Sequence, residues 1–187
     1  MQDEKDRVRG IACISILKYL RERKGEKAVE EVLAGLEPEE KASLQNIKPK
    51  DWVSYDTITK VWTGILEILG GDKEETSKIL ARYIAEDNTK WFLKLYLAFA
   101  TPEKIMKKIP TLWKMYFDKG EVITEKLEKG LCISKAVNYT PRPHACICGI
   151  EWTRYALEKC GAKNVGTKEI KCIRKGDDCC EFENRWE

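Results

Sequence analysis

A single histidine stands among the 187 residues, and the sequence has neither a Cys-x2-Cys pair nor a Gly-x-Gly-x-x-Gly segment. The sequence offers no candidate Ser-His-Asp set, and the missing glycine pattern removes the phosphate-binding turn that a nicotinamide cofactor requires. The missing cysteine pairs argue against a zinc ribbon or a zinc finger. We therefore expect that the protein is not an enzyme.

Long apolar runs are missing as well. No stretch approaches the roughly eighteen apolar residues that a membrane-spanning helix needs, and the apolar segment behind the charged start MQDEKDRVRG is too short for a signal peptide. The 34 basic and 31 acidic residues are interspersed, so we expect neither a nucleic acid nor a membrane surface as a partner. The pattern predicts a cytoplasmic protein, in which cysteines stay reduced.

The first 118 residues show the spacing of apolar side chains that is typical of helices. Val8, Ile11 and Leu17 fall on one face of a helix that Gly25 ends. Further on, Thr101 is a helix cap followed by a proline at the first helical position. The predicted helices cover about 8–24 and 26–36, a segment beginning at 38, 54–69, 72–100 with a break near 87–88, and 102–118 with a kink or restart at Pro110.

After residue 118 the apolar period changes to two, which is typical of strands. The pattern predicts a hairpin over 121–139, a helix over 144–160 and a second hairpin over 164–186. The fold class is α+β, with N-terminal helices packed on a C-terminal β-β-α-β-β antiparallel sheet. We expect a single domain over 1–187, with a helical part over 1–118 and the β-β-α-β-β part over 119–187.

Three cysteines and one glutamate come together in this predicted topology. A short turn brings Cys172 close to Cys180, and a helix packed across the hairpin can present Cys146. Together with Glu169, three thiolates form a closed tetrahedral ligand set for Zn²⁺. Two alternatives stay open, namely small cysteines buried beneath a sheet and a disulfide of the kind that some thermophiles keep inside the cell.

Neighbouring residues on a strand point to opposite faces, which separates Cys179 from Cys180. Cys180 shares its face with Phe182, whereas Cys179 shares its face with Glu181 and Glu183. We therefore expect Cys180 to point inward and Cys179 to point toward solvent.

The carboxylate is harder to place than the thiols. Glu169 and Cys172 are three residues apart, so both can reach one metal only if a twist or a bulge interrupts the strand. Either Cys148 or water is the alternative fourth ligand.

The segment CICGIEWTRYALEKCGAKNVGTKEIKCIRKGDDCCEF resembles the 4-vinyl-reductase (bacteriochlorophyll 4-vinyl reductase-like) family of small-molecule-binding domains. It is similar, too, to the sensor domain of the phenol- and xylene-responsive activators, in which three cysteines and a glutamate bind zinc. The spacings of 23, 3 and 8 residues match Cys146, Glu169, Cys172 and Cys180. The resemblance implies zinc as the cofactor. It also implies the fold of the ligand-binding domain found in NO signalling and Golgi transport, which haem-NO-binding domains and vesicle-tethering (TRAPP) subunits share.

The resemblance also implies a sensor-like domain for a small hydrophobic or aromatic ligand. Four aromatic residues would line its pocket, namely Trp91, Tyr96, Trp113 and Tyr116, although aromatic side chains at helical spacing also occur as plain core. A homodimer or another protein partner would carry the output signal. The alternatives are a protein–protein adaptor without a ligand and an accessory protein of tetrapyrrole or pigment metabolism.

Haem is not expected from the sequence. The haem sensors that share the fold implied by the resemblance need a proximal histidine and a Tyr-x-Ser-x-Arg motif that anchors the haem propionates. The chain has only His144, at a predicted helix start, and it lacks the anchor.

Overall fold

The computed structural model describes residues 6–89 and 92–187, and for 92–95 it describes the backbone alone. The chain forms two compact units, residues 1–88 and 89–187. The single folding domain expected from the sequence stays a prediction. None of the described helices combines the length and the apolar character that crossing a membrane requires.

The first unit is a helical bundle with a small two-stranded ribbon. Helix α1 contacts α2, α4 and α5, and buried apolar side chains such as Leu20, Ile65 and Leu80 fill the space between them. The ribbon pairs β1 with β2 in antiparallel register. The elements are β1 (Arg7–Arg9), α1 (Gly10–Lys24), α2 (Glu26–Ala34), α3 (Pro38–Gln45), β2 (Trp52–Ser54), α4 (Tyr55–Leu69) and α5 (Lys73–Asn88).

The start of α1 differs from the helix predicted over 8–24. Val8 pairs with Val53 in the ribbon, so the helix begins only at Gly10. The Gly10 amide donates a hydrogen bond of 2.8 Å to the Asp51 carbonyl. A Cβ atom at this position would overlap the carbonyl oxygen of Lys48 and lie 2.7 Å from Cγ1 of Ile47. Glycine therefore allows the loop before β2 to pack directly on the start of α1.

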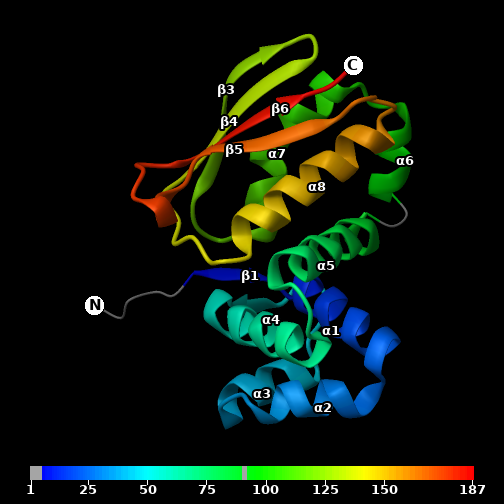
Figure 1. The fold of residues 1–187 in the computed structure, drawn as a ribbon, viewed down its shortest axis with the longest axis vertical. Coiled ribbons are helices and arrows are strands. Elements are labelled where there is room, and N and C mark those ends of the chain that lie inside the picture. The colour runs from blue at the N-terminus through cyan, green and yellow to red at the C-terminus, as the bar shows by residue number, and fades with distance from the viewer. Residues whose placement is uncertain (1–5, 90–91) are drawn as a thin grey trace. The chain divides into compact units, whose positions relative to one another are not determined.

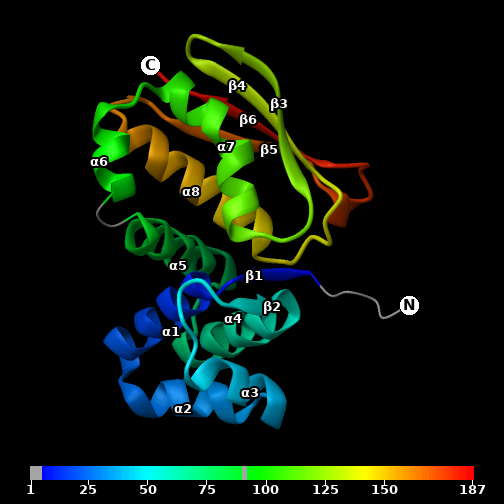
Figure 2. The same cartoon turned by 180° about the vertical axis from the view of Figure 1, so that it is seen from behind.

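The second unit is a four-stranded antiparallel sheet with helices on one face, as Figures 1 and 2 show. The strand order is β3-β4-β6-β5, so the strand that comes last in the chain lies between two earlier ones. This arrangement confirms the predicted α+β class and the β-β-α-β-β order. The elements are α6 (Phe92–Phe99), α7 (Pro102–Tyr116), β3 (Glu121–Glu128), β4 (Leu131–Val137), α8 (Ala145–Lys159), β5 (Gly166–Lys171) and β6 (Cys180–Arg185).

Small residues face the helices from the centre of the sheet. Along β4, Cys132, Ser134 and Ala136 are buried, whereas Leu131 and Ile133 on the opposite face are only partly covered. The sequence pattern had suggested Leu131 and Ile133 as the regular apolar positions of this strand. Two buried clusters lie under the helices, one of Met106, Cys132, Leu157 and Trp186 and the other of Ala136, Cys146, Cys172 and Cys180.

The outer face of the sheet carries charges of both signs. Lys135 on β4 lies 2.6 Å from a carboxylate oxygen of Glu125 and 3.4 Å from one of Glu181. Arg185 contacts Glu183 through two nitrogens at 2.8 Å each. This face is therefore compatible with water, and the side chains that can hold a ligand or a metal lie on the opposite, helix-covered face.

Candidate functional site

A β-bulge in β5 places the predicted ligands on one face of the sheet. Glu169 pairs with Phe182 and Lys171 pairs with Glu181, so Ile170 is an extra residue without a partner on β6. On a regular strand Glu169 and Cys172 would point to opposite faces. Because the extra residue shifts the register, both can face the helices. The structure thus contains the interruption that a shared site of Glu169 and Cys172 requires.

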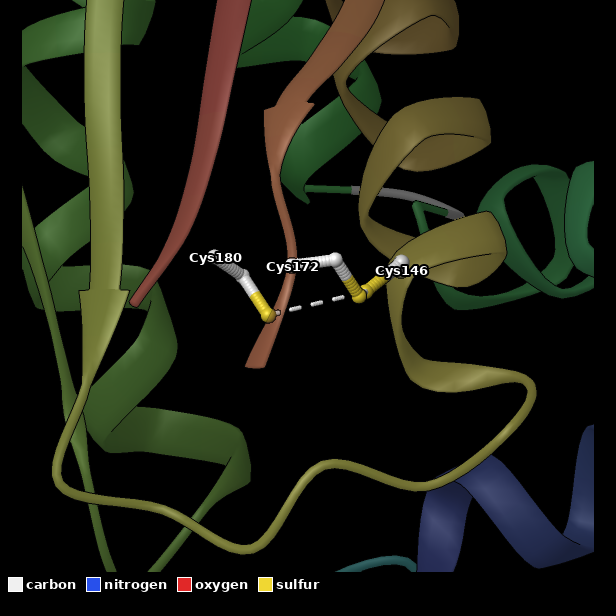
Figure 3. A group of neighbouring side chains, drawn as sticks. All are labelled: Cys146, Cys172 and Cys180. Atoms are coloured by element: carbon white, nitrogen blue, oxygen red, sulfur yellow. Dashed lines mark hydrogen bonds between the residues drawn. The ribbon is translucent and has the colours of Figure 1, made fainter. Parts of the chain in front are cut away.

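Three thiols meet where α8 crosses this part of the sheet. Cys146 belongs to the first turn of α8, Cys172 follows β5 directly, and Cys180 begins β6. The Cys146 sulfur lies 3.9 Å from the Cys172 sulfur and 3.8 Å from the Cys180 sulfur, and all three atoms lie within 4.8 Å of one another. Figure 3 shows the three side chains pointing toward one another. All three are buried, with at most 8% of each residue exposed.

The Glu169 carboxylate lies beside these thiols and is also held from outside. Its Oε2 accepts a hydrogen bond of 2.6 Å from the exposed Lys175, whereas its buried Oε1 has no hydrogen-bond partner among the described residues. Burial acts to raise the pKa of this carboxyl, but the neighbouring Cys146, Lys175 and Cys172 outweigh burial, and the pKa lies below its ordinary value. Glu169 is therefore a carboxylate aimed at the thiol cluster.

The protein environment disfavours the ionised form of Cys146 and of Cys172. Burial, followed by the neighbouring Glu169, raises the pKa of Cys146 far above its ordinary value, and burial also raises the pKa of Cys172. Thiolates are the form that binds metals, and a bound cation displaces the thiol protons. The arrangement is therefore one in which ionised cysteines need a cation to compensate their charge.

The adjacent cysteines Cys148 and Cys179 take no part in the cluster. Cys179 interacts with Asp178, away from the three thiols, but it is only 3% exposed. The expectation that Cys179 points toward solvent is therefore wrong, because neighbouring side chains cover it. Cys148 lies elsewhere on α8 near Glu151, and burial raises its pKa to about 12. Among the described residues, the group whose ligand atoms lie within 4.8 Å of one another holds the three thiols alone, and neither Glu169 nor Cys148 belongs to it.

The aromatic residues expected around a ligand lie in different surroundings. Trp113 stacks on Phe117 with ring centres 4.2 Å apart and meets the edge of Tyr139 at 5.3 Å. Burial raises the pKa of Tyr116. Tyr96 is partly buried, and Trp91 lies outside the described residues. Their role as ligand contacts stays a prediction.

Two polar residues that the sequence reasoning missed lie on the inner face of the sheet. Thr167 on β5 pairs directly with Asn184 on β6, and Asn184 is 1% exposed. Oγ1 of Thr167 and Oδ1 of Asn184 are buried without a hydrogen-bond partner among the described residues. The alternation of side chains along a strand could have placed both residues on the inner face, because Thr167 precedes Glu169 by two positions and Asn184 follows Phe182 by two.

No family model matches the sequence, and no curated protein matches it either, so the resemblance to the 4-vinyl-reductase family gains no support from these comparisons. Solved structures do match. An H-NOX protein from S. oneidensis in the Fe(II)NO ligation state has a TM-score of 0.75 at 12% identity, over 96% of this chain and 99% of that one.

Two further structures agree with this match. The unliganded Fe(II) H-NOX protein from K. algicida has a TM-score of 0.73 at 10% identity, over 96% of both chains. A structure from work on haem distortion in the H-NOX family has a TM-score of 0.70 at 16% identity, over 96% of this chain and 95% of that one. At these identities the likeness establishes a shared fold.

The comparison contradicts zinc as the cofactor. The H-NOX structures that share the fold are described in Fe(II) states and in connection with haem, so the cofactor that they indicate is haem and not zinc. The prediction had rested on the spacing of the four residues together with the family resemblance. The spacing correctly identified three thiols that lie close together, but it did not establish zinc as the cofactor.

Proposed function

We propose that the chain is a small-molecule-binding, sensor-like domain, and that the ligand binds within residues 89–187 on the helix-covered face of the sheet. The observation that carries the proposal is the pair of buried oxygens on Thr167 and Asn184, for which the described part of the chain supplies no hydrogen-bond partner. The fold supports it, since the H-NOX protein from S. oneidensis is described with NO bound.

The surroundings of this pair define the kind of ligand. Side chains of directly paired residues lie about 5 Å apart on the same face, so one donor group can reach both oxygens. Cys132, which pairs with Asn184 from the other side, belongs to the apolar cluster with Met106 and Leu157. Leaving a buried polar group unsatisfied costs about 1–3 kcal/mol, so a ligand that supplies a donor gains that much in return. We therefore expect an apolar molecule with one hydroxyl or amine group.

A thermal-shift panel of such molecules tests the proposal. A ligand at about 100 times its Kd should add about 2.7 kcal/mol of stability, or roughly 5–10 °C in Tm. Thr167→Val should abolish the shift while leaving the free protein at least as stable, because it removes an unsatisfied hydroxyl. Thr124→Val is the matched control, because Oγ1 of Thr124 already donates to the Met106 carbonyl at 3.4 Å. The Thr124→Val variant should keep the ligand-induced shift in Tm. If no compound of the panel shifts the Tm of the wild-type protein, the proposal of ligand binding is wrong.

Haem needs a separate test because the neighbours indicate it. A haem iron needs an axial ligand, and the sole histidine, His144, is 4% exposed. Burial, helped by the charges of Arg142 and Arg174, lowers its pKa to about 3. The neutral ring suits iron, but a cavity wide enough for haem would leave far more of it exposed. The histidine therefore fits haem poorly in this structure, and the absorption spectrum after adding hemin should show no sharp Soret band.

The thiol cluster is part of the same proposal as a structural metal site. Cys146, Cys172, Cys180 and Glu169 would supply three sulfur ligands and one oxygen ligand, a set that suits soft or borderline transition-metal ions. The four ligands would leave no open position for a substrate. A metal bound here would hold α8 on the sheet beside the ligand site, and elemental analysis of the purified protein identifies the ion.

A further inference from the structure

The solvent-facing side of α7 carries an unmixed positive charge. Positions 104, 107, 108, 111, 114 and 115 fall on one side of the helix at 100° per residue, and all six are at least partly exposed. Four of them are lysines, and the other two are Thr111 and Met115, the latter 59% exposed. No acidic residue lies within this lysine face, which consists of Lys104, Lys107, Lys108, Thr111, Lys114 and Met115.

Some of the other lysines in this unit form ion pairs with carboxylates. Lys135 contacts Glu125 and Glu181, and Lys175 contacts Glu169. Within the described residues, none of the four lysines of the lysine face forms an ion pair with its ammonium group. Basic residues also outnumber acidic ones by 19 to 13 over 89–187, whereas acidic residues outnumber basic ones by 18 to 15 over 1–88. The face is therefore a local source of positive potential.

The opposite side of α7 limits what can bind. Ile105 and Met106 are fully buried, because this side of the helix packs on β3 and α8. The helix has no apolar side left to insert into a lipid bilayer, which an interfacial helix requires. The face has lysines alone, without the arginines and stacking aromatic rings that are typical of nucleic-acid contacts.

A helix of a protein partner matches the dimensions of this face. From Lys104 to Lys114 the face extends about 15 Å, which is close to three helical turns. Glutamates spaced three and four residues apart along a partner helix would meet these lysines. Met115, which is 59% exposed, offers an apolar contact at one end of the lysine face.

We propose that the lysine face of α7 is the docking surface for an acidic, helix-forming segment of a partner protein. The proposal rests on the proposed sensor-like function in one respect, since a ligand-binding domain needs a partner to receive its signal. It names the chemistry of that partner, a run of glutamates or aspartates on one side of a helix, with apolar residues at its margin.

The test compares two variants with the same loss of charge in the full chain. The first replaces Lys104, Lys107, Lys108 and Lys114 with glutamine. The matched control replaces four other lysines of the same unit, namely Lys129, Lys159, Lys163 and Lys168. The probe is a fluorescein-labelled 20-residue peptide with Glu at helical i and i+4 positions and two leucines, measured by anisotropy at about 0.15 M salt. Exposed ion pairs are individually weak, so four of them should together amount to about a tenfold difference in Kd.

A tenfold or larger rise in Kd for the first variant, with less than a twofold rise for the control, supports the proposal. Equal losses in both variants overturn it, because net charge alone would then explain binding. It is also overturned if the peptide does not bind, and in particular if phosphatidylserine vesicles, single-stranded DNA or a second copy of the chain depend on this face instead. The ligand-induced thermal shift, measured on the same variants, should be unchanged. Absence of that shift in the wild-type protein, with its peptide binding intact, would disprove the sensor-like function alone.

Discussion

Cys180→Ala should abolish the metal binding that we propose for the thiol cluster and should lower the free energy of unfolding by roughly 3–5 kcal/mol. The sulfur of Cys180 lies 3.8 Å from that of Cys146 and belongs to a strand at the centre of the sheet. Without it, two thiols and Glu169 remain, and a tetrahedral site is incomplete. Metal content measured by inductively coupled plasma mass spectrometry, together with urea unfolding, reports both effects.

Cys132→Ala is the matched control for the loss of a buried sulfur. Cys132 is also fully buried on the inner face of the sheet, but it lies in the other cluster, with Met106, Leu157 and Trp186. The Cys132→Ala substitution should lower the free energy of unfolding by about 1–2 kcal/mol, because it leaves a cavity, and it should leave metal binding unchanged. Cys179→Ala should keep it as well. If wild-type protein prepared without chelator contains no metal, or if Cys180→Ala retains it, the ligand assignment is wrong.

Gly10→Ala should destabilise the N-terminal unit by about 2–3 kcal/mol, which corresponds to roughly 5–10 °C in Tm. A methyl group at this position would overlap the Lys48 carbonyl oxygen and crowd the Ile47 side chain. Relief requires that the loop before β2 move, and this movement would weaken the 2.8 Å hydrogen bond from the Gly10 amide to Asp51. Circular dichroism during urea unfolding measures the loss.

Gly64→Ala separates this clash from the general effect of a methyl group. Gly64 lies inside α4, and a Cβ there would meet Val32 at 3.4 Å, an ordinary contact distance. Alanine is favoured over glycine in a helix interior by about 0.5–1 kcal/mol, so this variant should be more stable than wild type. A Gly10→Ala protein that is as stable as wild type would mean that the loop does not pack on α1 as described.

The sequence was most informative where a regular period persisted. The alternation after residue 118 predicted both hairpins and the helix between them, and the glycine-ended helices of the first unit followed from their apolar spacing. The three-residue strands β1 and β2 are too short to show any period, and only the register of Val8 with Val53 defines them. Their pairing depends on residues more than forty positions apart, which local patterns do not contain.

The candidate site was predictable in part for the same reason. Side chains alternate between the two faces of a strand, so the apolar Phe182 correctly predicted that Cys180, two positions before it, points inward. It could not predict that Cys179 would be covered, since this depends on side chains from other elements. The inner face of β4 was also missed, because close packing of helices on a sheet selects small residues such as Cys132 and Ala136, which a search for large apolar residues overlooks.

The strand order has a consequence for how the protein assembles during synthesis. β5 is translated before β6, yet β6 is the strand with which it pairs in the described sheet. Until β6 emerges from the ribosome, β5 has an unsatisfied edge and the β3–β4 hairpin lacks its neighbour. The pairing of Leu131 with Arg185 then closes a loop of more than fifty residues, which makes sheet closure a slow, late step. A nascent chain paused between β5 and β6 would therefore expose two open edges, and such edges are a common starting point for aggregation.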